Sequence, residues 1–397
     1  RFLAVALLSA DSFGGTMRNQ RKTMVAAVAA LSLVVAACGS DGDSSSSSSD
    51  ATEAPAATEA PVATEAPAAT EAPAEPSFNV GLTYDIGGRG DQSFNDSAAA
   101  GLDAAKAALG VTGSEAEPNA DGSDRAQLLQ LQADNSELVI AVGFLFAGDV
   151  VAVATENPDT NFAVVDDAML DFDNGAVPLG DNIAGLTFAE EQGSFLVGAA
   201  AALKSETGTL GFIGGVGGFG LIEKFEAGFT AGAQAVNPDI TVIPQYITQA
   251  PDFDGFFAAD RAQEIALTMY DQGADIVYHA AGGSGAGLFE AAKSRSESSG
   301  SQVWAIGVDS DQYNTAGADF QPYILTSMLK RVDVSVLEIA TAQADGTFTA
   351  GNTVYDLSSD GVGYSTTGGY LDDIVDQLEA LKAQIIAGEI VVPTAPA

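Results

Sequence analysis

The chain has 397 residues, of which 46% are hydrophobic, so it can bury the cores of two domains. Its formal net charge of −39 gives a surface that repels nucleic acid and anionic lipid. A single cysteine excludes an internal disulfide, and a single histidine disfavours multi-histidine zinc sites and most histidine-dependent catalytic triads. The composition therefore predicts a two-domain protein with no nucleic-acid partner, and we expect neither a metal site nor a cofactor.

The amino-terminal segment has the pattern of an export signal. Met17–Lys22 is a basic stretch, and Thr23–Ala37 is an apolar run that is too short to span a bilayer comfortably. Small residues precede Cys38, which resembles the lipobox of bacterial lipoproteins. That resemblance implies cleavage before Cys38 and lipidation of this residue, so residues 1–37 are expected to be upstream residues and a signal peptide. The alternative is an ordinary signal peptide with an incidental cysteine.

Residues 38–77 have the composition of a tether. Gly39–Asp50 contains six consecutive serines, and Ala51–Pro76 repeats Ala-Thr-Glu-Ala-Pro with small variations. Such segments lack the apolar bulk to form a core, and proline-rich repeats favour an extended chain. The expected role of this segment is to hold a folded domain away from the membrane.

From Phe78 onward, short β-rich runs alternate with longer helical runs, which is typical of parallel sheets covered on both faces. The expected strands are Phe78–Tyr84, Leu138–Val142, Phe162–Asp166, Ile183–Thr187, Leu210–Ile213, Ile240–Tyr246, Asp275–Tyr278, Val303–Val308 and Ile324–Met328. The expected helices are Ser97–Leu109, Asp124–Asp134, Ala147–Asn157, Glu190–Lys204, Leu221–Val236, Phe256–Gln272, Gly287–Ser298, Arg331–Asp345 and Tyr370–Ala387. The pattern predicts an α/β fold with two doubly wound lobes.

The loop Asp85–Asp96 combines three glycines with carboxylates, an amide and an aromatic residue. It follows an expected strand and precedes an expected helix, and open α/β sheets bind ligands at such carboxyl ends of strands. The alternative is a polar connection in which Ser93 or Asn95 caps the helix.

Two further glycine-rich turns lie at Gly214–Gly220 and Gly282–Gly287. The first contains G-x-G-x-x-G after a strand and before a helix, which is the pattern of a dinucleotide-binding loop. It lies in mid-chain, and no clear acidic residue closes a second strand about 20 residues further on. We therefore favour close packing or ligand lining as the role of these glycines.

Several collinear segments resemble the basic membrane protein family, which comprises substrate-binding lipoproteins of ABC transporters and includes purine nucleoside receptors. The resemblance implies a type I periplasmic-binding-protein fold with a ligand cleft between two lobes. We expect lobe one at 78–188 and 320–348, and lobe two at 189–319 and 349–397. The matching segments begin at Asp85, Gly143, Phe188, Gly211, Lys224, Tyr278, Ile306 and Thr326.

The same resemblance implies that aromatic side chains sandwich the base of a nucleoside. Phe94 matches one of them, and the second is expected near Tyr278. Asp85, Asn95 and Asp149 are candidates for hydrogen bonds to the base, with helix capping as the alternative for all three and especially for Asp149. For Phe94 and Tyr278 the alternative is packing in the core.

The sugar end of the ligand is expected at three further residues. Asp309 follows a strand, and a carboxylate there can accept hydrogen bonds from two ribose hydroxyls. Lys330 follows the next strand and can donate to a sugar oxygen, and Gly283 allows backbone amides to approach the ligand. An Asp309–Lys330 ion pair that braces the cleft is the alternative. His279 is expected to be structural.

These features predict an exported, lipid-anchored receptor on the extracytoplasmic face of the cell membrane. It would capture a purine nucleoside or a related small polar ligand by lobe closure and deliver it to an ABC permease, without catalysis. The alternatives within binding proteins are a sugar, a furanosyl autoinducer or a flavin as ligand, and a signalling role. The alternative of another class is a secreted nucleoside-acting enzyme.

Overall fold

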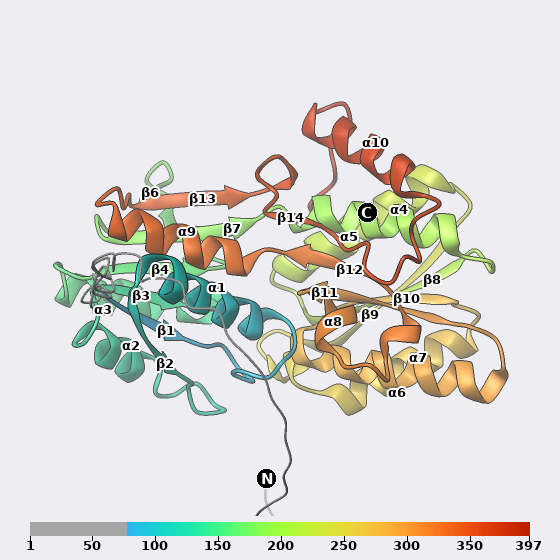
Figure 1. Ribbon diagram of the computed structural model, residues 1–397, viewed down its shortest axis with the longest axis horizontal. Coiled ribbons are helices and arrows are strands. Elements are labelled where there is room, and N and C mark those ends of the chain that lie inside the picture. The colour runs from blue at the N-terminus through green and yellow to red at the C-terminus, as the bar shows by residue number, and fades with distance from the viewer. Residues whose placement is uncertain (1–77) are drawn as a thin grey trace, which may run out of the picture. The chain divides into compact units, whose positions relative to one another are not determined.

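The computed structural model describes residues 78–397 (Figure 1). The expected signal peptide, the lipidation site at Cys38 and the tether lie outside the described residues, so they stay predictions. Within residues 78–397, no helix combines the length and apolar character needed to cross a membrane.

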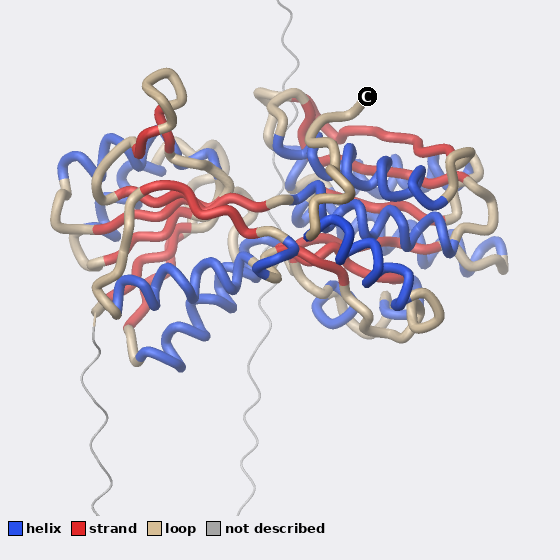
Figure 2. The backbone as a smooth tube through the Cα atoms, turned by 90° about the horizontal axis from the view of Figure 1, so that it is seen from above, coloured by secondary structure: helices blue, strands red, loops and turns tan. Residues whose placement is uncertain are grey.

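The expected strands and helices from Phe78 onward are confirmed, with shifted ends. Together with three strands that were not expected, the nine expected strands form two six-stranded sheets with helices on both faces (Figures 1 and 2). The first sheet has the order β13-β7-β4-β3-β1-β2, and all its neighbouring strands are parallel. Its strands are β1 (Asn79–Thr83), β2 (Thr112–Ala116), β3 (Leu138–Ala141), β4 (Asn161–Val165), β7 (Ile183–Phe188) and β13 (Gly351–Tyr355). A short hairpin of β5 (Leu170–Asp171) and β6 (Val177–Pro178) follows β4.

The second sheet has the order β14-β12-β11-β10-β8-β9. Its strands are β8 (Thr209–Gly217), β9 (Thr241–Gln249), β10 (Ile276–Ala280), β11 (Trp304–Asp309), β12 (Ile324–Lys330) and β14 (Val362–Tyr364). Only β14 runs antiparallel to its neighbour, β12. A parallel strand must be reached by a crossover connection, which explains why helices separate most strands along the chain.

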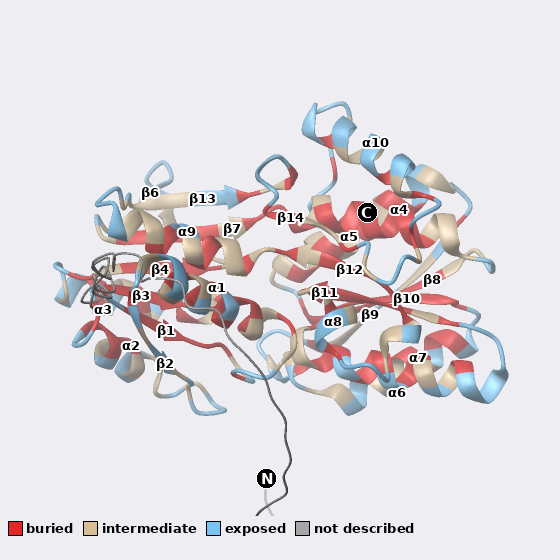
Figure 3. Cartoon of the chain, in the orientation of Figure 1, coloured by how far each residue is buried: buried red, intermediate tan, exposed pale blue. Residues whose placement is uncertain are grey.

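Alternate residues of each buried strand face different helices. In β3, Ile140 packs in the core that includes α1 and α9, whereas Val139 and Ala141 pack in a separate core with α2 and α3. In β10, Tyr278 faces α4 and α5 while Val277 faces α6 and α7. The buried residues therefore follow the sheets and the inward faces of the helices (Figure 3). The helices are α1 (Phe94–Leu109), α2 (Arg125–Ala133), α3 (Ala147–Glu156), α4 (Glu190–Lys204), α5 (Leu221–Val236), α6 (Ala259–Asp271), α7 (Gly285–Ser299), α8 (Gln312–Thr315), α9 (Val332–Ala344) and α10 (Val375–Ile386).

The lobe boundaries differ from those expected. The chain passes between the sheets three times: from β7 to α4, from β12 to α9, and after β13. Strand β12 was expected in lobe one but pairs with β11 of the second sheet, and β13 was expected in lobe two but pairs with β7 of the first. Local sequence identifies a strand but not its partner, because pairing depends on contacts that are remote in the chain.

Helices α4 and α5 pack closely because glycines bring their backbones together. A Cβ atom on Gly232 would meet the carbonyl of Phe195, and one on Gly228 would meet the carbonyl of Glu191. Since both obstacles are backbone atoms of a buried helix, they cannot move aside as a flexible side chain would.

We therefore expect Gly232→Ala to lower the free energy of unfolding by about 1–3 kcal/mol. Gly148→Ala in α3 is the matched control, because a Cβ atom there meets nothing within 4 Å. The control should be neutral or stabilise the protein by up to about 1 kcal/mol through its higher helix propensity. Urea denaturation followed by circular dichroism checks both values, and equal effects of the two substitutions would contradict the close-packing account.

Candidate functional site

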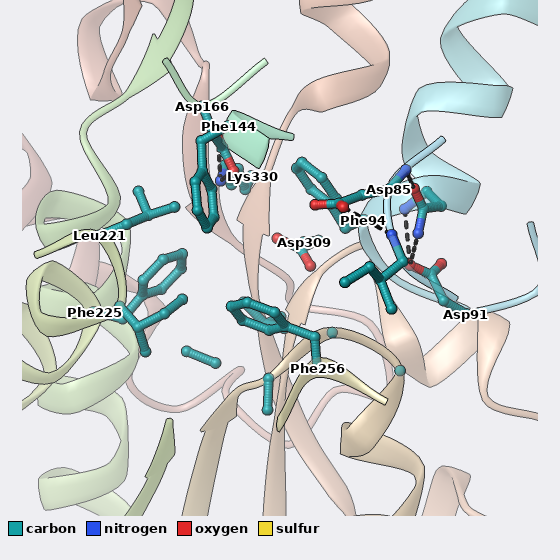
Figure 4. Close-up of a pocket in the computed structure, with 18 residues that line it drawn as sticks. Asp85, Asp91, Phe94, Phe144, Asp166, Leu221, Phe225, Phe256, Asp309 and Lys330 are labelled. Carbon is teal, nitrogen blue, oxygen red and sulfur yellow. Dashed lines mark hydrogen bonds and ion pairs between the residues drawn. The ribbon is translucent and has the colours of Figure 1, made fainter. Parts of the chain in front are cut away.

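A cavity lies where the carboxyl ends of strands from both sheets meet (Figure 4). The first sheet contributes residues after β1, β3 and β4, and the second contributes residues of β10, β11 and β12 and the start of α5. This is the position at which open parallel sheets bind ligands. The lining residues are Asp85, Ile86, Asp91, Phe94, Asn95, Phe144, Asp166, Leu221, Ile222, Phe225, Phe256, Ala280, Ala281, Gly282, Gly283, Val308, Asp309 and Lys330.

Six of the predicted ligand residues line this cavity: Asp85, Phe94, Asn95, Gly283, Asp309 and Lys330. They come from distant parts of the chain and from both sheets. Their role in binding stays a prediction, but their placement around one cavity is a property of the fold.

Tyr278 and Asp149 are not among the lining residues. Tyr278 is fully buried in the core of the second sheet, where its ring lies 5.1 Å from Phe229 and 5.6 Å from Phe212 between centroids. Its hydroxyl lies 3.2 Å from Ser194 Oγ. The structure thus places Tyr278 in the core, where it cannot stack on a ligand in this cavity. Asp149 lies in the first turn of α3 and is half-buried.

Three phenylalanines that were not predicted as ligand residues also line the cavity, namely Phe144, Phe225 and Phe256. Figure 4 shows their rings, together with that of Phe94, surrounding the central space. Phe225 falls in one of the segments that resemble the family, next to Lys224, so its position in the sequence was a usable signal. Phe256 was expected to begin a helix but ends a short 3₁₀ turn, Asp254–Phe256, before α6.

The loop between β1 and α1 is organised by the carboxylate of Asp91. This carboxylate accepts hydrogen bonds from the backbone N–H groups of Ser93 (2.9 Å), Asn95 (2.8 Å) and Asp96 (3.1 Å), so it caps the amino end of α1. The side chains of Ser93 and Asn95, expected as possible caps, have other partners. Asn95 Oδ1 accepts from the N–H of Asp85 at 3.0 Å, which fixes Asp85 at the cavity.

Lys330 is the central cation of the site and is almost fully buried. Its Nζ lies 2.7 Å from the Asp166 carboxylate and 3.4 Å from Glu190 Oε1, and Glu190 Oε2 lies 3.0 Å from Lys224 Nζ. Burial by itself lowers the pKa of Lys330, but the surrounding carboxylates together outweigh it and raise this pKa, so the ammonium stays charged. The aromatic rings of Phe94 and Phe188 each lie 5.1 Å from Nζ.

The Asp309–Lys330 ion pair that was the alternative to ligand binding does not form. Lys330 pairs instead with Asp166, and Asp309 Oδ2 accepts a hydrogen bond of 2.6 Å from Ser93 Oγ. Asp309 has φ +63°, a left-handed conformation at the end of β11. Burial raises its pKa to about 7, while Lys330 and Ser93 oppose this shift.

Asp85 is the second carboxyl with a strongly raised pKa. Burial raises its pKa to about 7, and the hydrogen bond of 2.8 Å that its Oδ1 accepts from the N–H of Ile86 opposes the shift. Asp85 and Asp309 thus combine burial with few protein donors, and their oxygens are suited to accept hydrogen bonds from a ligand.

The remaining motifs are structural. Strand β8 continues to Gly217, so two of the three glycines of the G-x-G-x-x-G motif, Gly215 and Gly217, lie in the strand. A Cβ atom on Gly215 would contact the ring of Phe256. His279 is fully buried, and burial lowers its pKa to about 4. Its Nε2 lies 2.9 Å from Gln312 Oε1, and its ring packs edge-on against Phe289.

The buried ion network predicts a large effect for Lys330→Met. This substitution leaves Asp166 without its partner in a buried environment, so we expect the free energy of unfolding to fall by about 3–5 kcal/mol. Lys382→Met is the matched control, because Lys382 pairs with the exposed Asp360 and its loss should cost about 0–1 kcal/mol. Urea denaturation measures both, and similar losses would contradict the assigned importance of the network.

The raised pKa of Asp85 predicts a pH dependence of stability. The folded state holds a proton on this carboxyl that the unfolded chain releases between about pH 4 and pH 7, so its contribution to stability falls as the pH rises through that window. We expect Asp85→Asn to match the wild type near pH 4 and to exceed its free energy of unfolding by about 2–4 kcal/mol above pH 7.

Asp376→Asn in α10, where the side chain is exposed, controls for the loss of one negative charge. Denaturation of the three proteins at several pH values gives the comparison. A stability difference for Asp85→Asn that does not change between pH 4 and pH 8 would show that burial of this carboxyl does not control its protonation.

Comparison with known proteins identifies the family. The family model for PnrA-like substrate-binding proteins of ABC transporters matches residues 78–395. A CD4+ T-cell-stimulating antigen of Listeria innocua is 34% identical over 93% of this chain and 97% of its own length. An ABC transporter nucleoside-binding protein, BmpA, of Lactococcus lactis is 33% identical over 79% of this chain and 88% of its own. A solute-binding protein of an ABC transporter from Aeropyrum pernix, solved by crystallography, has a TM-score of 0.65 and 27% identity over 79% of this chain and 93% of its own. The chain therefore belongs to the PnrA-like family of ABC transporter substrate-binding proteins.

Proposed function

We propose that this protein captures a nucleoside between its two lobes and delivers it to the permease of an ABC importer. The observation that carries this proposal is a cavity that combines phenylalanine rings with buried carboxylates from both sheets. The relative in Lactococcus lactis that is named as a nucleoside-binding protein supports the same class of ligand.

The phenylalanines are suited to a flat heterocycle. Phe94 comes from the first lobe, and Phe225 and Phe256 come from the second, so rings from the two lobes can contact opposite sides of a base. Each aromatic pair contributes about 0.5–1.5 kcal/mol beyond the burial of apolar area. We assign to one of these residues of the second lobe the stacking role that was expected for Tyr278.

The polar residues are suited to the hydrogen-bond donors and acceptors of a nucleoside. Asp85 lies beside Phe94 (Figure 4), and Asn95 lines the same cavity from the start of α1. Both would bind N–H groups of the base. Asp309 would accept from ribose hydroxyls, and Lys330 would donate to a sugar oxygen. A base and a sugar thus each meet groups of matching hydrogen-bonding type.

The charge of the cavity favours an uncharged ligand over a phosphorylated one. Asp85, Asp91, Asp166 and Asp309 line it, against the single cation Lys330, which Asp166 already neutralises. A phosphate group would be buried next to carboxylates without a free cation, which is unfavourable.

The proposal includes anchoring by lipid at Cys38 on the extracytoplasmic face of the membrane. Its support is the lipobox-like sequence before Cys38 and the tether that follows it. Mass spectrometry of the protein from membranes tests the anchor, since an unmodified Cys38 at an uncleaved site would contradict it.

Isothermal titration of the purified protein with inosine, guanosine, adenosine, ribose and inosine 5′-monophosphate tests the ligand class. We expect at least one nucleoside to bind, with ribose and the monophosphate at least about 100-fold weaker. Phe94→Ala should weaken nucleoside binding about 10- to 100-fold, because it removes a stacked ring from a desolvated pocket.

Phe172→Ala is the matched control, because Phe172 is 71% exposed in the β5–β6 hairpin segment and does not line the cavity. It should leave the affinity unchanged. Tight binding of ribose alone would keep the transport role but replace the nucleoside with a sugar, and binding of the monophosphate with equal affinity would contradict the charge argument.

A further inference from the structure

The side chain of Gln312, which is 1% exposed, lies at the contact between the two lobes without lining the ligand cavity. It belongs to α8 of the second lobe. Its Nε2 donates a hydrogen bond of 3.1 Å to the backbone carbonyl of Gln92, which lies in the first lobe just before α1. The amide therefore joins two segments that are far apart in the sequence.

The orientation of this amide is determined by its partners in the second lobe. The backbone N–H of Val308 donates to Oε1 at 2.9 Å, and a backbone N–H can only donate. His279 Nε2 lies 2.9 Å from the same oxygen, and the buried, neutral imidazole supplies a second donor there. With Oε1 held by these two groups, Nε2 must point toward the first lobe, at the Gln92 carbonyl.

Other hydrogen bonds join the same two segments. Thr315 Oγ1 also donates to the Gln92 carbonyl, at 3.0 Å, and Ser310 Oγ donates to the Ser93 carbonyl at 3.0 Å. Gln92 has φ +59°, a conformation that residues other than glycine rarely adopt. The carbonyl that accepts both Gln312 and Thr315 thus belongs to a residue in an unfavourable backbone conformation, next to Ser93 and Phe94.

We propose that Gln312 is a positioning residue for lobe closure, whose amide holds the Gln92 carbonyl and so stabilises the closed arrangement of the lobes without touching the ligand. The inference rests on the proposed function only in that the ligand is held between the lobes. Apparent affinity is reduced by the fraction of protein in the binding-competent arrangement, so weaker closure raises Kd and speeds release. The contact would therefore set how long the ligand is retained.

Gln312→Glu is the direct test, because it keeps the shape and the Oε1 acceptor but replaces the N–H donor with a second carboxylate oxygen. At pH 8 this oxygen faces the Gln92 carbonyl and repels it. We expect the closed-to-open ratio to fall about 10-fold or more, since the substitution removes a buried hydrogen bond and leaves its acceptor opposed by charge.

Lobe separation is measured by double electron–electron resonance in the full chain, with no ligand added. Spin labels are placed at Ala107→Cys on α1 and Ser294→Cys on α7, both exposed, in a background that carries Cys38→Ser. Because this readout needs no ligand, failure of nucleoside binding leaves it intact, and the two proposals can fail separately. Longer label distances in Gln312→Glu than in wild type support the proposed role of Gln312 in lobe closure, and unchanged distances at pH 8 overturn it.

A pH series distinguishes loss of the Gln312 hydrogen bond from a general packing defect caused by the substitution. Burial raises the pKa of a carboxyl, and a protonated Glu at this position regains an O–H donor toward the Gln92 carbonyl. At pH 5 the Gln312→Glu distances should return toward those of wild type at the same pH. The wild type is measured at each pH because burial raises the pKa values of Asp309 and Asp85 to about 7 and raises that of Asp91, which contacts Ser93. His279, with its pKa lowered to about 4 by burial, stays neutral over this range. Distances that stay long at pH 5 would overturn the proposal.

Two variants complete the test. Thr315→Val removes the second donor to the Gln92 carbonyl, at an exposed position. It should also lengthen the label distances, but by less than Gln312→Glu. If circular dichroism shows that Gln312→Glu does not fold, Thr315→Val is the variant that tests the proposal. Gln127→Glu, at an exposed position of α2, makes the same chemical change away from the contact and should not alter the distances. With inosine as the probe, a rise of about 10-fold in the dissociation rate should accompany the longer distances.

Discussion

The buried ammonium of Lys330 is the interaction on which the site depends. Lys330 ends β12, where the chain leaves the second sheet for α9, and it pairs with Asp166 after β4 of the first sheet and with Glu190 at the start of α4. A buried charge is tolerated only when partners of opposite charge surround it. The network therefore fixes three features together: the connection from β12 to α9 between the lobes, the ends of β4 and β12, and the part of the cavity that Asp166 and Lys330 line.

Strand ends in both lobes place carboxylates at the cavity through uncommon backbone conformations. Asp166, with φ +70°, follows β4, and Asp309, with φ +63°, ends β11. Such left-handed conformations carry an energetic cost in residues other than glycine and persist where the surroundings determine them. Here the surroundings are Lys330 for Asp166 and Ser93 for Asp309, so the polar contacts that line the cavity also hold the backbone turns that form it.

Ligand contact and lobe contact share one short segment. Phe94 lines the cavity, whereas its neighbours Gln92 and Ser93 accept and donate hydrogen bonds across the lobe interface to residues 308–315. A ligand that positions Phe94 thus acts on the residues that join the lobes, and closure in turn acts on Phe94. This arrangement gives a direct route by which binding and closure are energetically coupled.

The sequence by itself determined the order and type of the main elements, because apolar periodicity reports directly on burial of one or both faces of a helix or strand. It also singled out Asp85, Asp309 and Lys330 at strand ends and Phe94 at the start of α1, and the fold places all four around one cavity. Local patterns missed β2 (Thr112–Ala116) and β13 (Gly351–Tyr355), since these edge strands are largely exposed and carry few apolar residues. They also missed β14 (Val362–Tyr364), which has only three residues.

Only the tertiary structure decided which sheet each strand joins and which way each side chain faces. Because side chains alternate along β10, Tyr278 and Val277 face opposite faces of the second sheet. Tyr278 is a core residue because α4 and α5 cover the face on which it lies. Likewise, the partner of Lys330 is Asp166 rather than Asp309, because the ends of β4 and β12 meet at the crossing between the sheets. Such choices depend on contacts between residues that are remote in the chain, 84 positions apart for Tyr278 and Ser194 and 164 for Lys330 and Asp166, about which local periodicity carries no information.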